Sequence, residues 1–191
     1  GEKNTAFKAD KGLEAYEDFE SFYKDFIAEA KRLTHIFLHE QDIASEYAQK
    51  ARPSYLISSM LDDCMARGRN MHAGGVRYHD YGGTPLALPA TADGLFAIKQ
   101  AVFEEKICTA KELVDAMKAD YKGYEALQAK LKRLPKYGTD HEEADAMAAR
   151  VAGDFADMYL SYRTRWGGKG KPVILTFVYS PIAASQLGAT A

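Results

Sequence analysis

The chain of 191 residues carries a formal net charge of −2, and 47% of its residues are hydrophobic while 27% are charged. This balance is typical of a soluble globular protein that is long enough to bury a core. A charge so close to neutral excludes a global attraction to nucleic acid or to anionic lipid.

Two cysteines and the short apolar runs indicate the compartment. Cys64 and Cys108 lie far apart and show neither CxxC nor Cys/His ligand spacing, which is typical of a reducing environment. The longest apolar runs are too short to cross about 30 Å of hydrocarbon. No signal-peptide pattern is visible at the start of the sequence. We therefore expect a cytoplasmic protein, with neither a membrane nor nucleic acid as a partner.

The first predicted element is a long helix from Asp18 to about Lys50, which Pro53 must end. Apolar residues recur along it at steps of three and four, which places them on one broad face. We expect that face to be buried, with Phe22, Phe26 and Leu33 in the core. The apolar residues of this face are Phe19, Phe22, Tyr23, Phe26, Ile27, Ala30, Leu33, Ile36 and Phe37.

A second helix and a glycine-rich strand follow the proline. Ser54 can cap a helix that runs to Met65 and ends at Gly68, so helical structure is expected over about residues 18–68. Glycine pairs then flank an alternating stretch, which predicts an extended strand over residues 75–83.

Helices are predicted again over about residues 91–165. Their apolar residues repeat with a helical period, and cap or stop signals separate them. The predicted boundaries are a cap at Thr91, a capping box at Thr109 and Glu112, a stop at Pro135 and a second capping box at Asp140 and Glu143.

The last predicted elements are a flexible turn over residues 167–170 and a β-branched, aromatic strand over residues 173–180. The fold class is thus mainly α with a few short strands, and we take residues 1–191 as a single segment. Two short strands cannot make a stable sheet alone. They are expected to belong to a sheet whose other strands lie outside this sequence.

Candidate sites for chemistry are weak in this sequence. His35 and His39 share a helix face, as paired zinc ligands would, but the helical zinc pattern H-E-x-x-H is not completed. Residues 167–171 combine glycine and lysine like a phosphate loop, yet Pro172 and a strand follow where a helix is needed. Cys64 lies on the apolar face of its predicted helix, which favours a buried small hydrophobe. We predict no catalytic, cofactor-binding or metal site.

Several motifs in a fixed order carry a family resemblance. The sequence resembles the pyruvate formate-lyase-like domain of glycyl radical enzymes over nearly its whole length. The matching stretches are Arg52-Pro53-Ser54-Tyr55-Leu56-Ile57-Ser58-Ser59, Asp62-Asp63-Cys64-Met65-Ala66-Arg67-Gly68, Gly74-Gly75-Val76-Arg77-Tyr78, Val102-Phe103-Glu104-Glu105-Lys106 and Leu134-Pro135-Lys136-Tyr137-Gly138.

The resemblance implies a fold and a kind of chemistry. The family fold is a ten-stranded α/β barrel of two five-stranded half-sheets surrounded by helices. One loop at its centre carries a catalytic cysteine and another carries a glycine that is oxidised to a radical. An activating enzyme with an iron–sulfur cluster and S-adenosylmethionine installs that radical, which passes to the cysteine and then to a small substrate.

This chain carries neither radical residue of the family. Cys64 and Cys108 do not lie in a Gly-Cys-x-Glu setting, and no Arg-x-x-Gly-Tyr stretch occurs. The resemblance instead implies a wall segment whose residues after the second strand face the substrate. The implied substrate-binding candidates are Ser180, Ser185 and Gln186.

Two hypotheses follow. The first is a structural segment of a glycyl radical lyase or dehydratase, inactive alone, whose partners are the rest of the parent barrel, the activating enzyme and further copies of the parent. The alternative is a non-catalytic helical module that binds a partner protein through the long aromatic helix.

Overall fold

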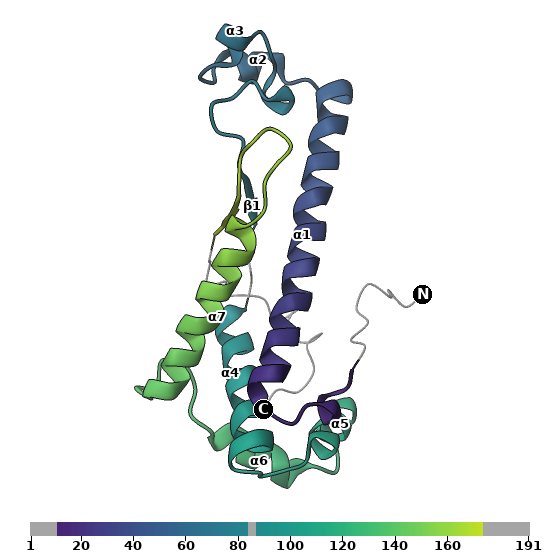
Figure 1. Cartoon of the computed structure of the whole chain (residues 1–191), viewed down its shortest axis with the longest axis vertical. Helices are drawn as coiled ribbons and strands as arrows, with labels where there is room; N and C mark the ends of the chain where they lie inside the picture. The colour runs from purple at the N-terminus through teal and green to yellow at the C-terminus, as the bar shows by residue number, and fades with distance from the viewer. Residues whose placement is uncertain (1–10, 84–86, 174–191) are drawn as a thin grey trace. The chain divides into compact units, whose positions relative to one another are not determined.

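The computed structural model describes residues 11–83 and 87–173 (Figure 1). The chain divides into two compact units. Within the described part, unit 1 comprises residues 11–29 and 87–152, and unit 2 comprises residues 30–83 and 153–173. The division is interlaced along the sequence, because each unit is built from separated stretches of the chain.

The long helix α1 (Phe19–Ala51) forms where the sequence predicts it. It begins after Asp18, whose carboxylate accepts hydrogen bonds of 2.8 Å from both the amide and the hydroxyl of Ser21. These bonds satisfy a free donor of the first turn, as an N-cap does. The helix ends two residues before Pro53, which cannot continue it.

The buried face of α1 is narrower than predicted. In unit 1, Phe19 and Tyr23 are buried but Phe22 and Phe26 are only half-buried. In unit 2, Leu33 is half-buried, and the predicted face is wrong for Ile36 and Phe37, which are 45% and 41% exposed. The inward positions there are Leu38, Asp42 and Ser45, which recur at helical steps and so turn Ile36 and Phe37 outward.

The predicted second helix is two short helices, α2 (Tyr55–Ser59) and α3 (Cys64–Arg67). The break lies at Asp63, whose φ of 71° is left-handed and incompatible with a continuing helix. Ser54 does not cap α2 with its side chain, whereas Gly68 ends α3 with a φ of 60°, as expected.

The glycine-rich segment forms less strand than predicted. It begins with the 3₁₀ helix η2 (Met71–Ala73), and β1 covers only Tyr81–Gly83 instead of residues 75–83. β1 pairs in parallel with β2 (Gly170–Pro172), with Tyr81 opposite Gly170. A strand is defined by its pairing, so β1 is short because its partner β2 is only three residues long. The strand predicted over residues 173–180 lies outside the described residues except for Val173.

Glycines allow the close approach that the β1–β2 pair requires. A Cβ atom on Gly83 would meet the ring of Tyr159, and one on Gly170 would meet the Tyr159 backbone. A Cβ atom on Gly168 would meet the carbonyl of His79. In contrast, nothing lies within 4 Å of the corresponding position on Gly82. Backbone and aromatic ring thus occupy the space that side chains would need.

In unit 1, the helix predicted to start at Thr91 begins earlier. α4 covers Leu88–Ile98, and Pro89 lies in its first turn, where the missing N–H costs nothing. The Thr91 hydroxyl donates to the Ala87 carbonyl at 3.1 Å and does not act as a cap. The helix continues as a π-helical segment, η3 (Lys99–Glu104).

The next two helices follow the predicted signals. α5 (Ala110–Lys118) begins after Thr109, whose hydroxyl accepts the Glu112 amide at 3.1 Å. This bond is one half of the predicted capping box. α6 (Glu125–Arg133) ends before Pro135. A 3₁₀ helix, η1 (Leu13–Ala15), precedes α1 in the same unit.

The last helix, α7 (Glu142–Leu160), begins and ends differently from the prediction. Asp140 has a φ of 60° and does not cap it; the ring nitrogen Nδ1 of His141 instead accepts the Ala144 amide at 3.4 Å. The helix ends before residue 165 because Thr164 is tied into a turn with Gly168.

The core of unit 1 is aliphatic and aromatic. Phe96 is 1% exposed and Val151 is fully buried. One cluster joins α4, η3, α5 and α6, and its members are Ala97, Ala101, Cys108, Leu113, Ala116, Tyr121, Leu127, Leu131 and Leu134. Burial raises the pKa of the Cys108 thiol, so this cysteine stays protonated. Among the helices of the described residues, none has the length and apolarity of a membrane span.

Replacing Phe96 with alanine is expected to lower the free energy of unfolding by about 3–5 kcal/mol, because it leaves a cavity in the core of unit 1. The matched control is Met117→Ala, since Met117 on α5 is 57% exposed, and its effect should stay near about 0.5 kcal/mol. Urea unfolding followed by circular dichroism measures both. Equal losses for the two variants would contradict the assigned core.

A glycine pair tests the close approach at β1. Gly83→Ala is expected to cost about 1–3 kcal/mol, because its Cβ atom would force the Tyr159 ring to move. Gly82→Ala meets open space and should change stability by about 0.5 kcal/mol or less. The comparison uses the same denaturation assay. A tolerated Gly83→Ala would show that the β1–β2 pair is not packed against Tyr159.

Candidate functional site

The strongest candidate site lies in unit 2, around a buried carboxylate. Asp42 on α1 is 8% exposed, and its two oxygens accept hydrogen bonds from the Tyr162 hydroxyl at 2.7 Å and the Arg165 amide at 3.0 Å. Burial alone would raise the pKa of Asp42, but these hydrogen bonds outweigh it and hold the pKa below its ordinary value. Asp42 is therefore a fixed negative charge.

Two tyrosines next to this charge stay protonated. Burial and the Asp42 carboxylate raise the pKa of Tyr162 to about 12. The same two causes raise the pKa of Tyr81 on β1, although its hydroxyl forms no hydrogen bond and is shielded from solvent. Both phenols therefore stay protonated and do not act as bases, and Tyr162 donates its proton to Asp42.

His79 precedes β1 and is also incompletely satisfied. Its Nε2 atom lies 3.0 Å from the Met71 carbonyl, while its Nδ1 atom is buried without a partner. The carbonyl can only accept, so Nε2 carries the proton and Nδ1 is left as a free acceptor. The ring lies edge-on to Tyr81, with 5.7 Å between ring centroids.

A cavity of about 430 Å³ is lined in part by His79 and Tyr81. It has room for a small metabolite, and its wall combines imidazole, phenol, amide and hydroxyl groups, which hydrogen-bond polar ligands. The lining residues from the glycine-rich segment and β1 are Met71, His72, Val76, Tyr78, His79, Asp80 and Tyr81, and those from α1 are Gln41, Ala44, Ser45 and Ala48.

Hydrogen bonds hold the segment before β1 in place. The Thr164 hydroxyl donates to the His79 carbonyl at 2.9 Å, and Asp80 accepts the Lys169 amide at 2.8 Å. Asp80 also pairs with Lys171 on β2 at 2.6 Å. The Lys171 hydrogen bond holds the pKa of Asp80 below its usual value. Lys169 and Lys171, from the stretch whose glycines and lysines do not complete a phosphate-loop pattern, therefore brace β1, and Pro172 continues β2.

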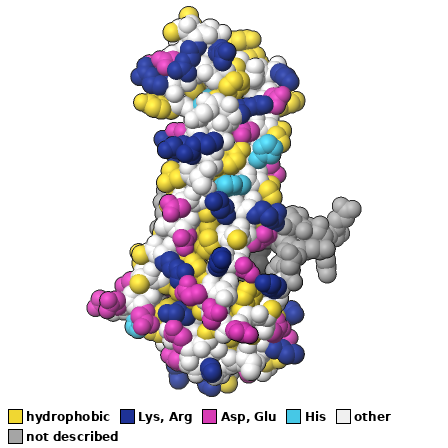
Figure 2. Space-filling model, in the orientation of Figure 1, with side chains coloured by type: hydrophobic (Ala, Val, Ile, Leu, Met, Phe, Trp, Pro, Cys, Tyr) yellow, Lys and Arg dark blue, Asp and Glu magenta, His cyan; other side chains and the backbone are white. Residues whose placement is uncertain are grey.

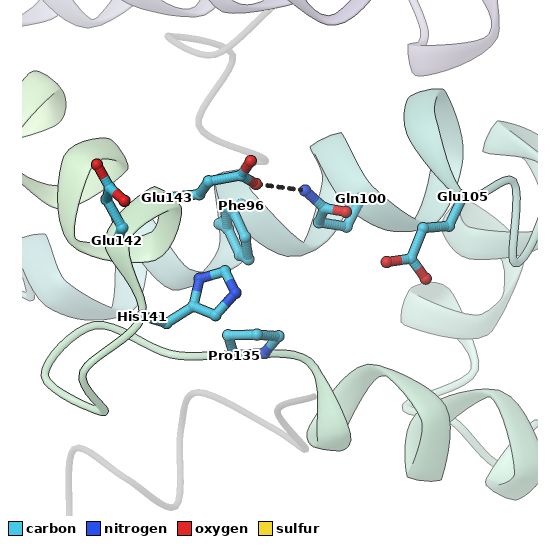
Figure 3. Close-up of a pocket in the computed structure, with 7 residues that line it drawn as sticks. All are labelled: Phe96, Gln100, Glu105, Pro135, His141, Glu142 and Glu143. Atoms are coloured by element: carbon cyan, nitrogen blue, oxygen red, sulfur yellow. Dashed lines mark hydrogen bonds between the residues drawn. The ribbon is translucent and has the colours of Figure 1, made fainter.

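A second hollow, of about 390 Å³, lies in unit 1 (Figure 3). Gln100 of η3 donates to Glu143 of α7 at 3.4 Å and to Glu104 at 2.6 Å. Glu105 and Glu142 complete an acidic rim, and His141 lies above Pro135 (Figure 3). Such a rim attracts cations, but no group of three or more metal-ligating side chains occurs within residues 11–83 and 87–173.

The predicted candidate residues lie apart from both cavities. His35 contacts the Met158 carbonyl at 3.2 Å and the Ser161 hydroxyl at 3.1 Å, and His39 is exposed. Neither histidine lines either cavity, and the two belong to the surface or its boundary. Cys64 is buried, as expected. The substrate-binding candidates Ser180, Ser185 and Gln186 lie outside the described residues.

Sequence reasoning missed Asp42 and Tyr81 altogether. A usable signal existed for Asp42, because it lies one helical turn after Leu38 on the inward face of α1. An acidic residue on a buried face needs partners, and Tyr162 and Arg165 come from distant sequence. For Tyr81 no local pattern predicts contact with α1.

Comparison with known proteins gives a consistent result. The model of the family described as "Pyruvate formate lyase-like" matches residues 2–180. The trans-4-hydroxy-L-proline dehydratase of Clostridioides difficile is 26% identical over 155 residues, which cover 81% of this chain and 20% of that protein. The isethionate sulfite-lyase of Oleidesulfovibrio alaskensis is 27% identical over 142 residues, which cover 71% and 17%.

A solved structure has the same fold over most of the chain. The glycerol-bound B12-independent glycerol dehydratase from Clostridium butyricum aligns with a TM-score of 0.81 and 28% identity. The alignment covers 88% of this chain and 22% of the dehydratase. The chain thus spans about a fifth of the length of the relatives that it matches.

Removing the Tyr162 hydroxyl tests the buried charge. In Tyr162→Phe, the pKa of Asp42 is expected to rise, because its carboxylate loses a donor. A carboxyl group whose pKa is lowered in the folded state stabilises the fold at pH values above its ordinary pKa of about 3.9. This stabilisation is lost as the pH falls through the pKa of the folded state. The variant should therefore lose stability at pH 7 and show a smaller further loss between about pH 5 and pH 3.

Carbon-13 NMR titration of the Asp42 carboxyl measures this pKa directly, and urea unfolding across the pH range measures the stability. Tyr137→Phe is the control, since Tyr137 is 51% exposed in unit 1. If the pKa of Asp42 is the same in Tyr162→Phe as in the wild type, the Tyr162 hydroxyl does not lower it.

Proposed function

The chain belongs to the pyruvate formate lyase-like family, and we propose that it is a structural segment of a glycyl radical lyase or dehydratase. The observation that carries the proposal is the joint match of sequence and fold to dehydratases and a sulfite-lyase over most of this chain. The parent enzyme would use a glycyl radical to cleave a C–C or C–heteroatom bond in a small metabolite.

The described residues support a role in the wall of a barrel. β1 and β2 are parallel and are separated by α4, η3, α5, α6 and α7, and a helical crossover of this kind connects parallel strands in α/β folds. Two strands of three residues do not form a stable sheet by themselves. In a complete barrel, further strands would pair with β1 and β2 and stabilise them.

The chemistry itself would come from outside this chain. The sequence holds no Gly-Cys-x-Glu and no Arg-x-x-Gly-Tyr stretch, so the radical glycine and the catalytic cysteine would lie elsewhere in the parent. A separate activating enzyme with an iron–sulfur cluster and S-adenosylmethionine would install the radical. Ser180, Ser185 and Gln186 are our proposed contacts to the substrate, because they follow the second strand.

One observation also favours the alternative, a helical module that binds a partner protein. On α1, Ile43 and Tyr47 are 56% and 70% exposed, so the unit 2 part of this helix presents apolar side chains outward. A wall segment of a larger enzyme presents such side chains as well, because further chain covers them. The family match supports the enzyme segment as the first of the two proposals.

The isolated chain is expected to show no turnover and no glycyl radical signal after treatment with an activating enzyme. The reason is that neither radical residue is present in its sequence. Electron paramagnetic resonance after anaerobic activation measures the signal. The positive control is the polypeptide encoded by the complete reading frame, which should give the radical doublet.

Two outcomes contradict the proposal. A radical doublet from the isolated chain would place a radical residue within it. A complete polypeptide that lacks a Gly-Cys-x-Glu loop upstream and a glycyl loop downstream, and that gives no doublet, would favour the helical binding module.

A further inference from the structure

The cavity in unit 2 is lined by polar side chains that have no partner within the part of the chain that the structure describes. The Gln41 amide on α1 and the His72 ring are half-buried in its wall, and neither side chain forms a hydrogen bond with a described residue. Tyr78 also lines the cavity and is 76% exposed. Side chains that hydrogen-bond only to water can exchange that water for the polar groups of a ligand.

His79 and Tyr81 contribute two more unsatisfied polar atoms. The Nδ1 atom of His79 and the hydroxyl of Tyr81 are shielded from solvent and have no partner among the described residues. Each atom costs free energy in the ligand-free fold, because it has lost water and gained no hydrogen bond. A ligand that moves either side chain toward the cavity and bonds to it removes that cost. The wall therefore favours a ligand with hydrogen-bond donors for imidazole nitrogen and acceptors for phenol.

Charge restricts the class of ligand. None of the described side chains in this wall belongs to Lys or Arg, so an anion would find no cation to offset its desolvation. The only carboxylate among them is Asp80, which already pairs with Lys171 at 2.6 Å. A cationic ligand would have to compete with Lys171. On the face shown in Figure 2, Lys and Arg side chains are interspersed with Asp and Glu, so no field of one sign attracts charged molecules.

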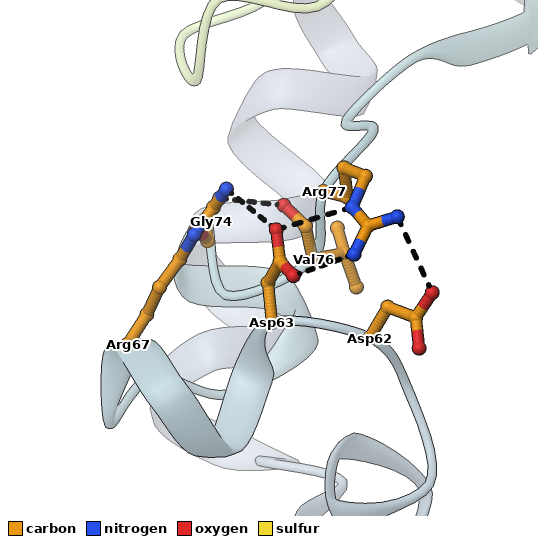
Figure 4. A network of polar contacts seen from close by, with 6 residues as sticks. All are labelled: Asp62, Asp63, Arg67, Gly74, Val76 and Arg77. Carbon is orange, nitrogen blue, oxygen red and sulfur yellow. Dashed lines mark hydrogen bonds and ion pairs between the residues drawn. The ribbon is translucent and has the colours of Figure 1, made fainter.

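A network of ion pairs holds the Val76 part of the wall (Figure 4). Arg67 donates to the Val76 carbonyl at 2.9 Å and pairs with Asp63 at 2.9 Å. Arg77 pairs with Asp63 at 3.0 Å, and the two arginines approach this carboxylate from opposite sides in Figure 4. The Val76 backbone is thus fixed before a ligand binds, which lowers the entropy cost of binding. Both guanidinium groups are engaged in the network, so they do not supply the positive charge that the cavity lacks.

The rest of the wall is apolar. Ala44 and Ala48 lie one turn apart on α1, and Met71 and Val76 come from the glycine-rich segment. A carbon skeleton packs against such side chains, while hydroxyl groups both donate and accept and so suit amide, imidazole and phenol. The volume of about 430 Å³ lies within the range of small-molecule pockets, about 300–1,000 Å³.

We propose that this cavity binds a small neutral polyol, a molecule of sugar size that carries several hydroxyl groups and no charge. Its hydroxyl groups bond to Gln41 and His72, and its carbon skeleton packs against the alanines of α1. The inference goes beyond the proposed function, since it concerns only side chains of unit 2 and requires no radical.

A charge series on one carbon skeleton tests the proposal. The probes are sorbitol, which is neutral, gluconate, which is anionic, and glucamine, which is cationic near neutral pH. Each is titrated into the 191-residue chain, and proton–nitrogen NMR follows the Gln41 side-chain amide and the His72 ring. Sorbitol is expected to give saturable shifts at the residues that line the cavity. The two charged probes should bind at least about tenfold more weakly, because the wall does not offset the desolvation of their charge.

A pair of variants tests the assigned contact. Gln41→Met keeps the length of the side chain but removes the amide, and it is expected to weaken sorbitol binding about fivefold to tenfold, as the loss of a hydrogen bond does. Gln49→Met is the matched control, because Gln49 is also half-buried on α1 but does not line the cavity. This control should leave the affinity unchanged. Circular dichroism verifies that both variants are folded.

Three outcomes overturn the inference. If sorbitol gives no saturable shift at the residues of the wall, the cavity does not bind a polyol. Equal affinity for the three probes contradicts a neutral ligand. An equal loss of affinity in Gln41→Met and Gln49→Met shows that sorbitol binds elsewhere. The radical measurement on the complete polypeptide tests the proposed function separately, so either proposal can fail without the other.

Discussion

The architecture of unit 2 depends on one buried negative charge. Asp42 on α1 binds Tyr162 and the backbone of Arg165, which follow the end of α7. These bonds anchor the chain after α7 to α1 and lead it into the turn that precedes β2. Only then does Gly170 lie opposite Tyr81. Loss of these two donors would leave a buried carboxylate without hydrogen-bond partners, which destabilises the folded state.

Local signals predicted the elements whose ends are decided locally. Asp18 and Pro53 bound α1, and Thr109 caps α5 through its own neighbour Glu112. The prediction of one continuous second helix was wrong, because a residue outside that helix determines where it breaks. Asp63 takes a left-handed conformation, and its carboxylate binds Arg77 fourteen positions later. No periodicity within the predicted second helix indicates that partner.

The same difference between local signals and distant contacts explains how much of the candidate site was predictable. The order of several motifs identified the family, because each motif reflects a position in a common fold. The individual site residues were not predictable, since His79 and Tyr81 become informative only when β1 lies beside α1 and leaves two polar atoms unsatisfied. Buried polar groups without partners are uncommon in folded proteins. Their presence next to a cavity is a structural observation with no counterpart in residue spacing.

The interlaced division of the chain has a consequence for the order of folding. Unit 2 draws on residues before 87 and after 152, so all of the unit 1 helices from α4 to α6 are synthesised between its two halves. Closing a loop of this length carries an entropy penalty that grows slowly with the number of residues. Contacts between residues so far apart in the sequence therefore form more slowly than local ones. Local helices form within microseconds, whereas the β1–β2 pair must wait for α7 to emerge and dock. On the ribosome, therefore, the part of α1 that belongs to unit 2 is without its partners while α4 to α6 are being made, and it lacks β2 until about residue 172 has been added.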